Sequence, residues 1–267
     1  MSAGDIEPAL VLCRGAGWNQ LREDWQRLIR YEPNGCFIAT CEGQLAGTVS
    51  TTRYGSDLGW IGMMLVDPEC RRRGIATALI QHSVDYLRSH GVRCISLDAT
   101  PVGLLVYQNT GFEVDWSFHR WRRTGSADGT PSLALSTSTR LNDQMLKLDR
   151  AAFGADRSVF LKLLSHESFS HVVSDGYGML RSGFLASYLG PICAETAAVA
   201  ETIAAELCAR ADGTIFWDIP APNTDAAEIA RSLGFTPVRD LTRMSLGAER
   251  LQPNLRLQYA LADPAVG

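Results

Sequence analysis

The sequence predicts an α/β fold that occurs twice along the chain. Strand-like runs alternate with amphipathic helical segments, and residues 60–66 form a continuous apolar run typical of a strand buried on both faces. The second half repeats features of the first: Ile95-Ser-Leu-Asp98 corresponds to Ile215-Phe-Trp-Asp218, and Gly111-Phe112 corresponds to Gly234-Phe235. This repeat is longer than the repeats of solenoids, so it indicates a duplicated domain.

The pattern of apolar residues and turn residues predicts each element of the first half. Residues 21–29 carry an apolar stripe at helical spacing behind a capping Asn19, and Glu42-Gly43 suits a hairpin turn. Gly91 stands where a helix commonly ends. In chain order, we expect a strand at 8–14, a helix at 21–29, strands at 36–40, 45–52 and 60–66, a helix at 75–90, a strand at 92–97, a helix at 102–109 and a hairpin at 113–122.

Residues between the halves are rich in Gly, Ser, Thr and Pro, as in a linker. We therefore expect a first domain at 1–125, a linker at 126–140 and a second domain at 141–267. In the second domain, a buried strand at 189–194 is followed by a helix near 196–210.

Composition and charge exclude several classes of protein. With a net charge of −4, the chain is a poor candidate for nucleic-acid binding, which needs a basic surface. No apolar run approaches the ~18 residues of a membrane span. The first residues do not resemble a signal peptide, and the seven cysteines include no Cys-x-x-Cys pair. We expect reduced, buried thiols in a cytoplasmic protein without membrane or nucleic-acid partners.

The segment after the apolar strand carries the strongest functional signal. Arg71-Arg72-Arg73-Gly74 is followed directly by the start of a helix, whose free N–H groups and dipole attract anions. Gly74 and Ala76 lack bulk, so a ligand can approach the main chain closely. A solvated basic turn is the alternative. The preceding buried strand and the small residues favour a cradle for a pyrophosphate group.

These residues resemble the acetyl-CoA motif of the GCN5-related N-acetyltransferases, Arg/Gln-x-x-Gly-x-Gly/Ala. The order of elements in 8–122 is also similar to that family, and a tandem subgroup carries a second acetyltransferase-like half. The resemblance implies a mixed sheet whose fourth and fifth strands splay apart around the pantetheine arm. It further implies acetyl-CoA as co-substrate, with backbone contacts from Leu65 and Val66 and amides from Arg71, Arg72, Arg73, Gly74, Ile75, Ala76 and Thr77.

Acetyl transfer to an amine requires the neutral amine. For an amine of pKa ~10.4, deprotonation at pH 7 costs roughly 4.6 kcal/mol, so a base or a water chain should help. The sequence leaves four candidates in the first half: Glu32, Tyr54, Asp98 and His119. By the resemblance, Tyr107 stands where the family places the group that hydrogen-bonds the leaving sulfur.

The second half departs from this pattern. Its buried strand runs into Glu195 without a Gly-containing basic turn, and Ala230 stands at the position equivalent to Tyr107. We expect this half to be degenerate, without a productive acetyl-CoA site. His166 and His171 are five residues apart, which rotates them off a common helix face, so no metal site is expected.

The leading hypothesis is an N-acetyltransferase that acts directly on the amine of a small molecule or an amino-acid-like acceptor. A protein N-acetyltransferase, acting on a lysine or a chain terminus, is the alternative among enzymes. A non-catalytic acyl-CoA sensor is the alternative from another class. The sequence leaves the oligomeric state open, a homodimer included.

Overall fold

The computed structural model describes residues 1–125 and 141–267 and divides them into two compact units. The predicted linker, 126–140, lies outside the described residues. Unit 1 comprises Met1–Asp115, Arg243–Leu251 and Pro264–Gly267, and unit 2 comprises Trp116–Thr242 and Gln252–Asp263. The units are therefore not contiguous in sequence, whereas the sequence-based division cuts the chain at a single place. Segments near the C-terminus belong to unit 1.

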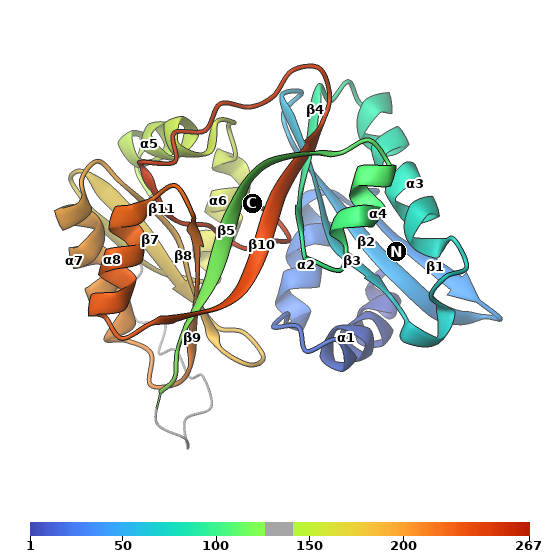
Figure 1. Ribbon diagram of the computed structural model, residues 1–267, viewed down its shortest axis with the longest axis horizontal. Helices are drawn as coiled ribbons and strands as arrows, with labels where there is room; N and C mark the ends of the chain where they lie inside the picture. The colour runs from blue at the N-terminus through green and yellow to red at the C-terminus, as the bar shows by residue number, and fades with distance from the viewer. Residues whose placement is uncertain (126–140) are drawn as a thin grey trace. The chain divides into compact units, whose positions relative to one another are not determined.

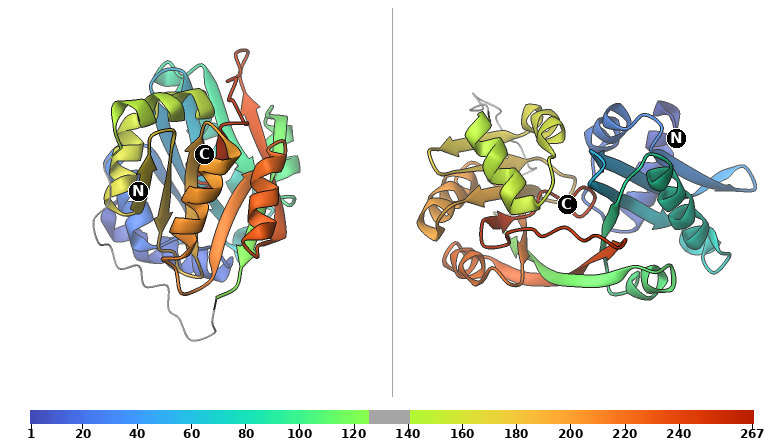
Figure 2. Two further views of the ribbon diagram at one scale, coloured as in Figure 1. Left: turned by 90° about the vertical axis from the view of Figure 1, so that its left-hand side faces the viewer. Right: turned by 90° about the horizontal axis from the view of Figure 1, so that it is seen from above.

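Unit 1 is a mixed sheet between two layers of helices (Figures 1 and 2). Helices α1 and α2 pack on β2 from one face, and α3 packs on β1, β2 and β3 from the other. The strand order is β1-β2-β3-β4-β10-β5, in which only the ends of β10 (Thr236–Leu246) and β5 (Glu113–Arg123) belong to this unit. Its elements are η1 (Ala3–Asp5), α1 (Ile6–Gly15), α2 (Arg22–Tyr31), β1 (Cys36–Cys41), β2 (Gln44–Tyr54), β3 (Leu58–Val66), η2 (Pro68–Cys70), α3 (Ile75–Ser89), β4 (Cys94–Ala99), α4 (Leu104–Asn109) and the start of β5 (Glu113–Arg123).

Unit 2 repeats this architecture. Its strand order is β6-β7-β8-β9-β5-β10, with β8 and β9 parallel, and α7 packs on β6, β7 and β8. Its remaining elements are α5 (Asp143–Phe153), α6 (Ser158–His166), β6 (Phe169–Val173), β7 (Gly176–Arg181), β8 (Ser187–Ala194), α7 (Ala197–Cys208), β9 (Ile215–Pro220), α8 (Thr224–Ser232), β10 (Thr236–Leu246) and β11 (Gln258–Ala260). The predicted tandem α/β organisation is confirmed.

Two predicted elements are wrong. Residues 8–14 form part of helix α1, because Ile6, Ala9, Leu10 and Cys13 are buried at helical spacing and Pro8 stands in the first turn, where no intrahelical donor is needed. Residues 113–122 form no hairpin but the single strand β5. No Gly, Pro or Asn interrupts this segment, and its sheet neighbours are β9 and β10.

The cores of both units consist of apolar side chains between the sheet and the helices. In unit 1, Ile61, Leu97 and Ala99 from the sheet pack with Leu79 from α3 and with Tyr107 from α4. This cluster fills the face of β3 and β4 on which α3 lies. The opposite face of β3 and β4 therefore lies outside this core.

Candidate functional site

Strands β3 and β4 separate beside the residues of β3 that are predicted to contact the cofactor. Their parallel pairing runs from Leu58 opposite Cys94 to Ile61 opposite Leu97 and ends there, although β3 continues to Val66. No described strand pairs with residues 62–66 on the side of β4. The gap lies between the strands at 60–66 and 92–97, as the family resemblance implied.

A bulge in β3 lies at the start of the gap. Met63 has a left-handed φ of 52°, and the register with β2 shifts between Thr48 and Ser50. The Thr48 Oγ1 hydroxyl donates to the Met63 carbonyl at 2.8 Å, which holds the bulge in place. Bulges bend a strand and change the direction of its backbone groups.

Beyond the bulge, the backbone of β3 alternates between β2 and the gap. The Asp67 N–H donates to the Ala46 carbonyl at 2.9 Å, toward β2, and Leu65 pairs with Thr48. Successive residues of an antiparallel strand point their backbone groups to opposite sides. The N–H and carbonyl of Val66 therefore point away from β2, and its carbonyl accepts a hydrogen bond from Arg71 Nε at 3.4 Å.

The predicted cradle is an exposed turn with two left-handed residues. Arg72 has a φ of 61° and Gly74 a φ of 79°, and Gly74 is the N-cap of α3, where no side chain caps the helix. A Cβ built on Gly74 would meet nothing within 4 Å, so the backbone conformation, not lack of space, favours glycine here. Left-handed turns of this kind direct N–H groups toward one point, and the helix dipole adds positive potential.

Most residues of the cradle are exposed to solvent. Arg71, Arg72, Arg73, Gly74 and Thr77 are exposed, whereas Ile75 and Ala76 are half-buried. Arg73 Nη1 lies 3.4 Å from Cys41 Sγ, at the end of β1.

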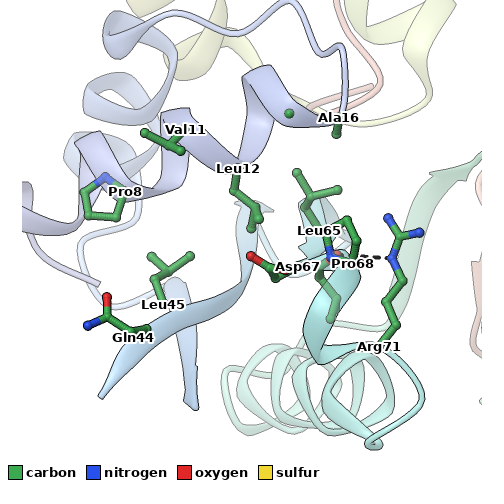
Figure 3. A pocket seen from close by; sticks show the side chains of 12 residues that line it. Pro8, Val11, Leu12, Ala16, Gln44, Leu45, Leu65, Asp67, Pro68 and Arg71 are labelled. Atoms are coloured by element: carbon green, nitrogen blue, oxygen red, sulfur yellow. Dashed lines mark hydrogen bonds between the residues drawn. The ribbon is translucent and has the colours of Figure 1, made fainter. Parts of the chain in front are cut away.

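A pocket of about 430 Å³ adjoins the end of β3 (Figure 3). Three residues predicted to contact the cofactor line it, together with apolar side chains from α1. The lining includes Leu65, Val66, Arg71, Val11, Leu12 and Leu45.

Tyr107 lies in the core of unit 1 and is 8% exposed. Its ring packs edge-on against Phe112, with centroids 6.1 Å apart. Burial, supported by the nearby charge of Asp98, raises the pKa of Tyr107 to about 12. The phenol therefore stays protonated at neutral pH and can act only as a hydrogen-bond donor or acid there.

Glu32, a candidate base, is buried and accepts three side-chain hydrogen bonds. Arg53 donates to both of its oxygens, at 2.7 and 2.9 Å, and the Tyr86 hydroxyl donates at 2.7 Å. Burial opposes ionisation most strongly, but the hydrogen bonds from Arg53 and Tyr86 together lower the pKa of Glu32. A carboxylate stabilised in this way is a weak base, so the contacts indicate a structural role.

The other base candidates have partners as well. The Tyr54 hydroxyl, in unit 1, donates to the Val266 carbonyl at 2.7 Å. His119 lies in unit 2, where its Nδ1 is 2.8 Å from an oxygen of the exposed Asp240. Of the four candidate bases, Glu32, Tyr54 and Asp98 lie in unit 1, whereas His119 lies in unit 2.

Asp98, the first residue of β4 beyond the paired region, forms a buried ion pair that sequence analysis missed. Arg243 from β10 donates to its two oxygens from Nε and Nη2, at 2.7 and 2.9 Å. The guanidinium carbon lies 4.4 Å from the ring centroid of Trp60 on β3. With both oxygens engaged, Asp98 is a poor proton acceptor.

Unit 2 contains the same arrangement. Arg120 from β5 donates to both oxygens of Asp218 on β9, at 2.8 and 2.7 Å, and lies 5.3 Å from the ring centroid of Tyr188 on β8. A sequence signal for these arginines exists. Each stands eight residues after the phenylalanine of a Gly-Phe pair, Gly111-Phe112 or Gly234-Phe235.

The gap in unit 2 is filled by the chain itself. Beyond Leu189, strand β8 pairs with β11, and the Leu261 N–H donates to the Asp218 carbonyl of β9 at 2.9 Å. Helix α7, which follows β8, is capped by its own Thr196 side chain. Ala230, the counterpart of Tyr107, is buried in the core.

The described residues lack two further features. None of their helices is long and apolar enough to cross a membrane. Within the same residues, no group of three or more His, Cys, Asp or Glu side chains is arranged to hold a metal ion.

Comparison with known proteins gives consistent matches for both halves. Residues 7–112 match the model of the acetyltransferase (GNAT) family, and residues 145–260 match that of an acetyltransferase (GNAT) domain. The uncharacterized N-acetyltransferase YitH of Bacillus subtilis is 28% identical over 240 residues, which is 86% of this chain and 84% of YitH.

Two solved structures share the fold along nearly the whole chain. A candidate acetyltransferase from Pyrococcus horikoshii superposes with a TM-score of 0.86 at 22% identity, covering 100% of this chain and 94% of its own. A tandem GNAT protein from the clavulanic acid biosynthesis pathway has a TM-score of 0.62 at 14% identity, covering 94% of this chain and 98% of its own.

Proposed function

The chain belongs to the GCN5-related N-acetyltransferase family and carries two domains of that family in tandem; on this premise, we propose that its first half transfers the acetyl group of acetyl-CoA to a small-molecule amine. The observation that carries the proposal is a contrast between the units. In unit 1, no described strand fills the gap beside β3, and no side chain caps α3. In unit 2, β11 fills the equivalent gap and Thr196 caps the equivalent helix.

The residues of unit 1 fit two parts of acetyl-CoA, the anionic pyrophosphate and the polar pantetheine arm. The left-handed turn at Arg72 and Gly74 and the N–H groups of Ile75, Ala76 and Thr77 would hold the pyrophosphate. Arg71 and Arg73 add positive charge beside them. The backbone of Val66 points away from β2 and would bond the pantetheine arm, while Leu65 contributes its side chain to the adjoining pocket.

When bound, acetyl-CoA supplies an activated acetyl group and a thiolate leaving group. Tyr107 would donate a hydrogen bond to the sulfur from α4. Complete proton transfer from a phenol of pKa about 12 to a thiolate whose acid has a pKa of ~8.5 would cost roughly 4.8 kcal/mol. Stabilisation of the thiolate by a hydrogen bond is therefore the role that the chemistry favours. A backbone N–H of β3 near Val66 would stabilise the developing charge on the carbonyl oxygen.

Deprotonation of the acceptor amine would occur through water rather than through Glu32 or Asp98. Both carboxylates are engaged by arginines, so neither is suited to accept a proton. We further propose that the second half is degenerate as an acetyl-CoA site, because its own chain fills the gap and Ala230 replaces the tyrosine.

The proposal is tested by binding of acetyl-CoA and by thiol release across a panel of small amines. We expect turnover with at least one amine and a reduction of about tenfold or more in Tyr107→Phe. Gly74→Glu should abolish binding through bulk and charge repulsion. Gly91→Glu is the matched control, because Gly91 has a φ of 76°, equally open surroundings and a place at the other end of α3.

Two outcomes would contradict the proposal. Undiminished acetyl-CoA affinity in Gly74→Glu would show that the pyrophosphate is held elsewhere. Tight binding without turnover on any amine would support a non-catalytic acyl-CoA sensor instead.

A further inference from the structure

Near the C-terminus, residues 264–266 lie on β3 where the gap begins. The Trp60 Nε1–H donates to the Pro264 carbonyl at 3.1 Å, and the Tyr54 hydroxyl donates to the Val266 carbonyl at 2.7 Å. Tyr54 is 1% exposed and Val266 is 3% exposed, so this contact is part of the packed interior. The segment thus lies against unit 1, to which Pro264–Gly267 belong.

Gly62 faces this segment and leaves no room for a side chain. A Cβ added to Gly62 would lie 2.1 Å from the Ala265 carbonyl oxygen and 2.8 Å from the Ala265 Cα. These are backbone atoms, which cannot move aside as the end of a flexible side chain can. Gly62 is also the first residue of β3 beyond the pairing with β4. Glycine at this position therefore permits the segment to lie at the start of the gap.

The other face of the same strands is closed. Ile61, Leu97 and Ala99 point into the core that contains Leu79 and Tyr107. Side chains alternate along a strand, so Trp60 and Gly62 point to the opposite face. An acceptor amine that reaches a thioester in the gap must approach from this opposite face, on which residues 264–266 lie.

We propose that residues 264–266 determine the size of the acceptor, by covering the part of β3 along which an extended peptide would have to lie. The inference rests on the proposed function and specifies its substrate class. Two carbonyls of the segment already accept hydrogen bonds from side chains of β2 and β3, so a peptide backbone cannot use those donors. A small amine, which needs only a narrow approach to the gap, is not obstructed.

The test compares two acceptor probes, alaninamide and a hexapeptide with a free N-terminal alanine. The readout is the ratio of kcat/KM for the hexapeptide to kcat/KM for alaninamide. Two variants displace the segment by different means: Gly62→Ala, through the contact with Ala265, and a chain that ends at Asp263. We expect the ratio to rise at least tenfold in both variants, with the Kd of acetyl-CoA unchanged within twofold.

Gly59→Ala is the matched control on the same strand. Its added Cβ would lie 2.9 Å from the methyl groups of Leu87, on the face of β3 that carries α3, and should leave the ratio unchanged. Should the truncated chain not fold, Tyr54→Phe removes the hydrogen bond to the Val266 carbonyl and should raise the ratio by a smaller factor.

The results separate the inference from the function on which it rests. A ratio that stays within threefold of the wild-type value in Gly62→Ala and in the truncated or Tyr54→Phe variant, while alaninamide is still acetylated, would overturn the inference alone. Failure of the wild type to acetylate any amine would overturn the proposed function and the inference with it.

Discussion

The buried ion pair between Asp98 and Arg243 gives a quantitative prediction. The side chain of Asp98 is 0% exposed and that of Arg243 is 7% exposed. Arg243→Met would keep most of the volume of the side chain but leave the carboxylate of Asp98 without its bidentate partner. Removing one partner of a buried pair typically costs about 3–5 kcal/mol, because the remaining charge loses its compensation.

For a chain of this size, 1 kcal/mol lowers the melting temperature by about 2–4 °C, so Arg243→Met should melt about 6–20 °C below the wild type. Thermal unfolding followed by circular dichroism measures this difference. The double variant Asp98→Leu/Arg243→Met removes both charges and should regain most of the lost stability, since well-packed apolar replacements of buried pairs are often nearly neutral.

Arg93 provides the control for this experiment. It forms ion pairs with Asp57 and Glu249, but its side chain is 54% exposed, so solvent screens these pairs and Arg93→Met should destabilise the protein far less than Arg243→Met. If Arg243→Met destabilises the protein no more than Arg93→Met does, the ion pair between Asp98 and Arg243 does not stabilise the fold as its burial implies. A double variant that is less stable than Arg243→Met would contradict the electrostatic reasoning itself.

Four further predictions follow from burial, pKa and topology. Because the pKa of Tyr107 is raised to about 12 in the folded protein, the unfolded chain loses this proton first as the pH rises above ~10. The free energy of unfolding should therefore fall between pH ~10 and about 12. Unfolding measured across that range should show a less steep fall in Tyr107→Phe. The fold lowers the pKa of Glu32, so the ionised carboxylate stabilises the protein above pH ~4.5, and this stabilisation is lost as the pH falls through the folded-state pKa. Glu32→Gln should remove this contribution to the acid dependence of denaturation curves and should change kcat less than tenfold. Only Cys41 and Cys70 are not fully buried, so mass spectrometry after brief native alkylation should find these two labelled before the other five. A chain of residues 1–125 lacks Arg243–Leu251 and Pro264–Gly267 of unit 1, and its amide exchange should show no stable core; a protected, cooperatively unfolding fragment would refute this.

Local sequence patterns were sufficient for most elements and for the candidate cofactor loop. The hairpin at Glu42-Gly43, the buried strand before Asp67 and the helix after Gly74 all follow from periodicity and turn chemistry within about fifteen residues. The error at 8–14 arose because a short apolar run fits a strand and a helix equally well, and Pro8 obscured the start of the helix.

The sequence by itself determined the two-domain α/β organisation and pointed to the loop that we propose as the pyrophosphate site, since both depend on residues close together in the chain. Only the tertiary structure decided which strands far apart in the sequence are neighbours. It placed Arg243 beside Asp98, 145 residues away, put residues 264–266 on Gly62 and filled the gap of unit 2 with β11. The physical reason is that strand pairing follows from the burial and hydrogen bonding of the whole fold, and alternation along one strand specifies its faces but not its partner.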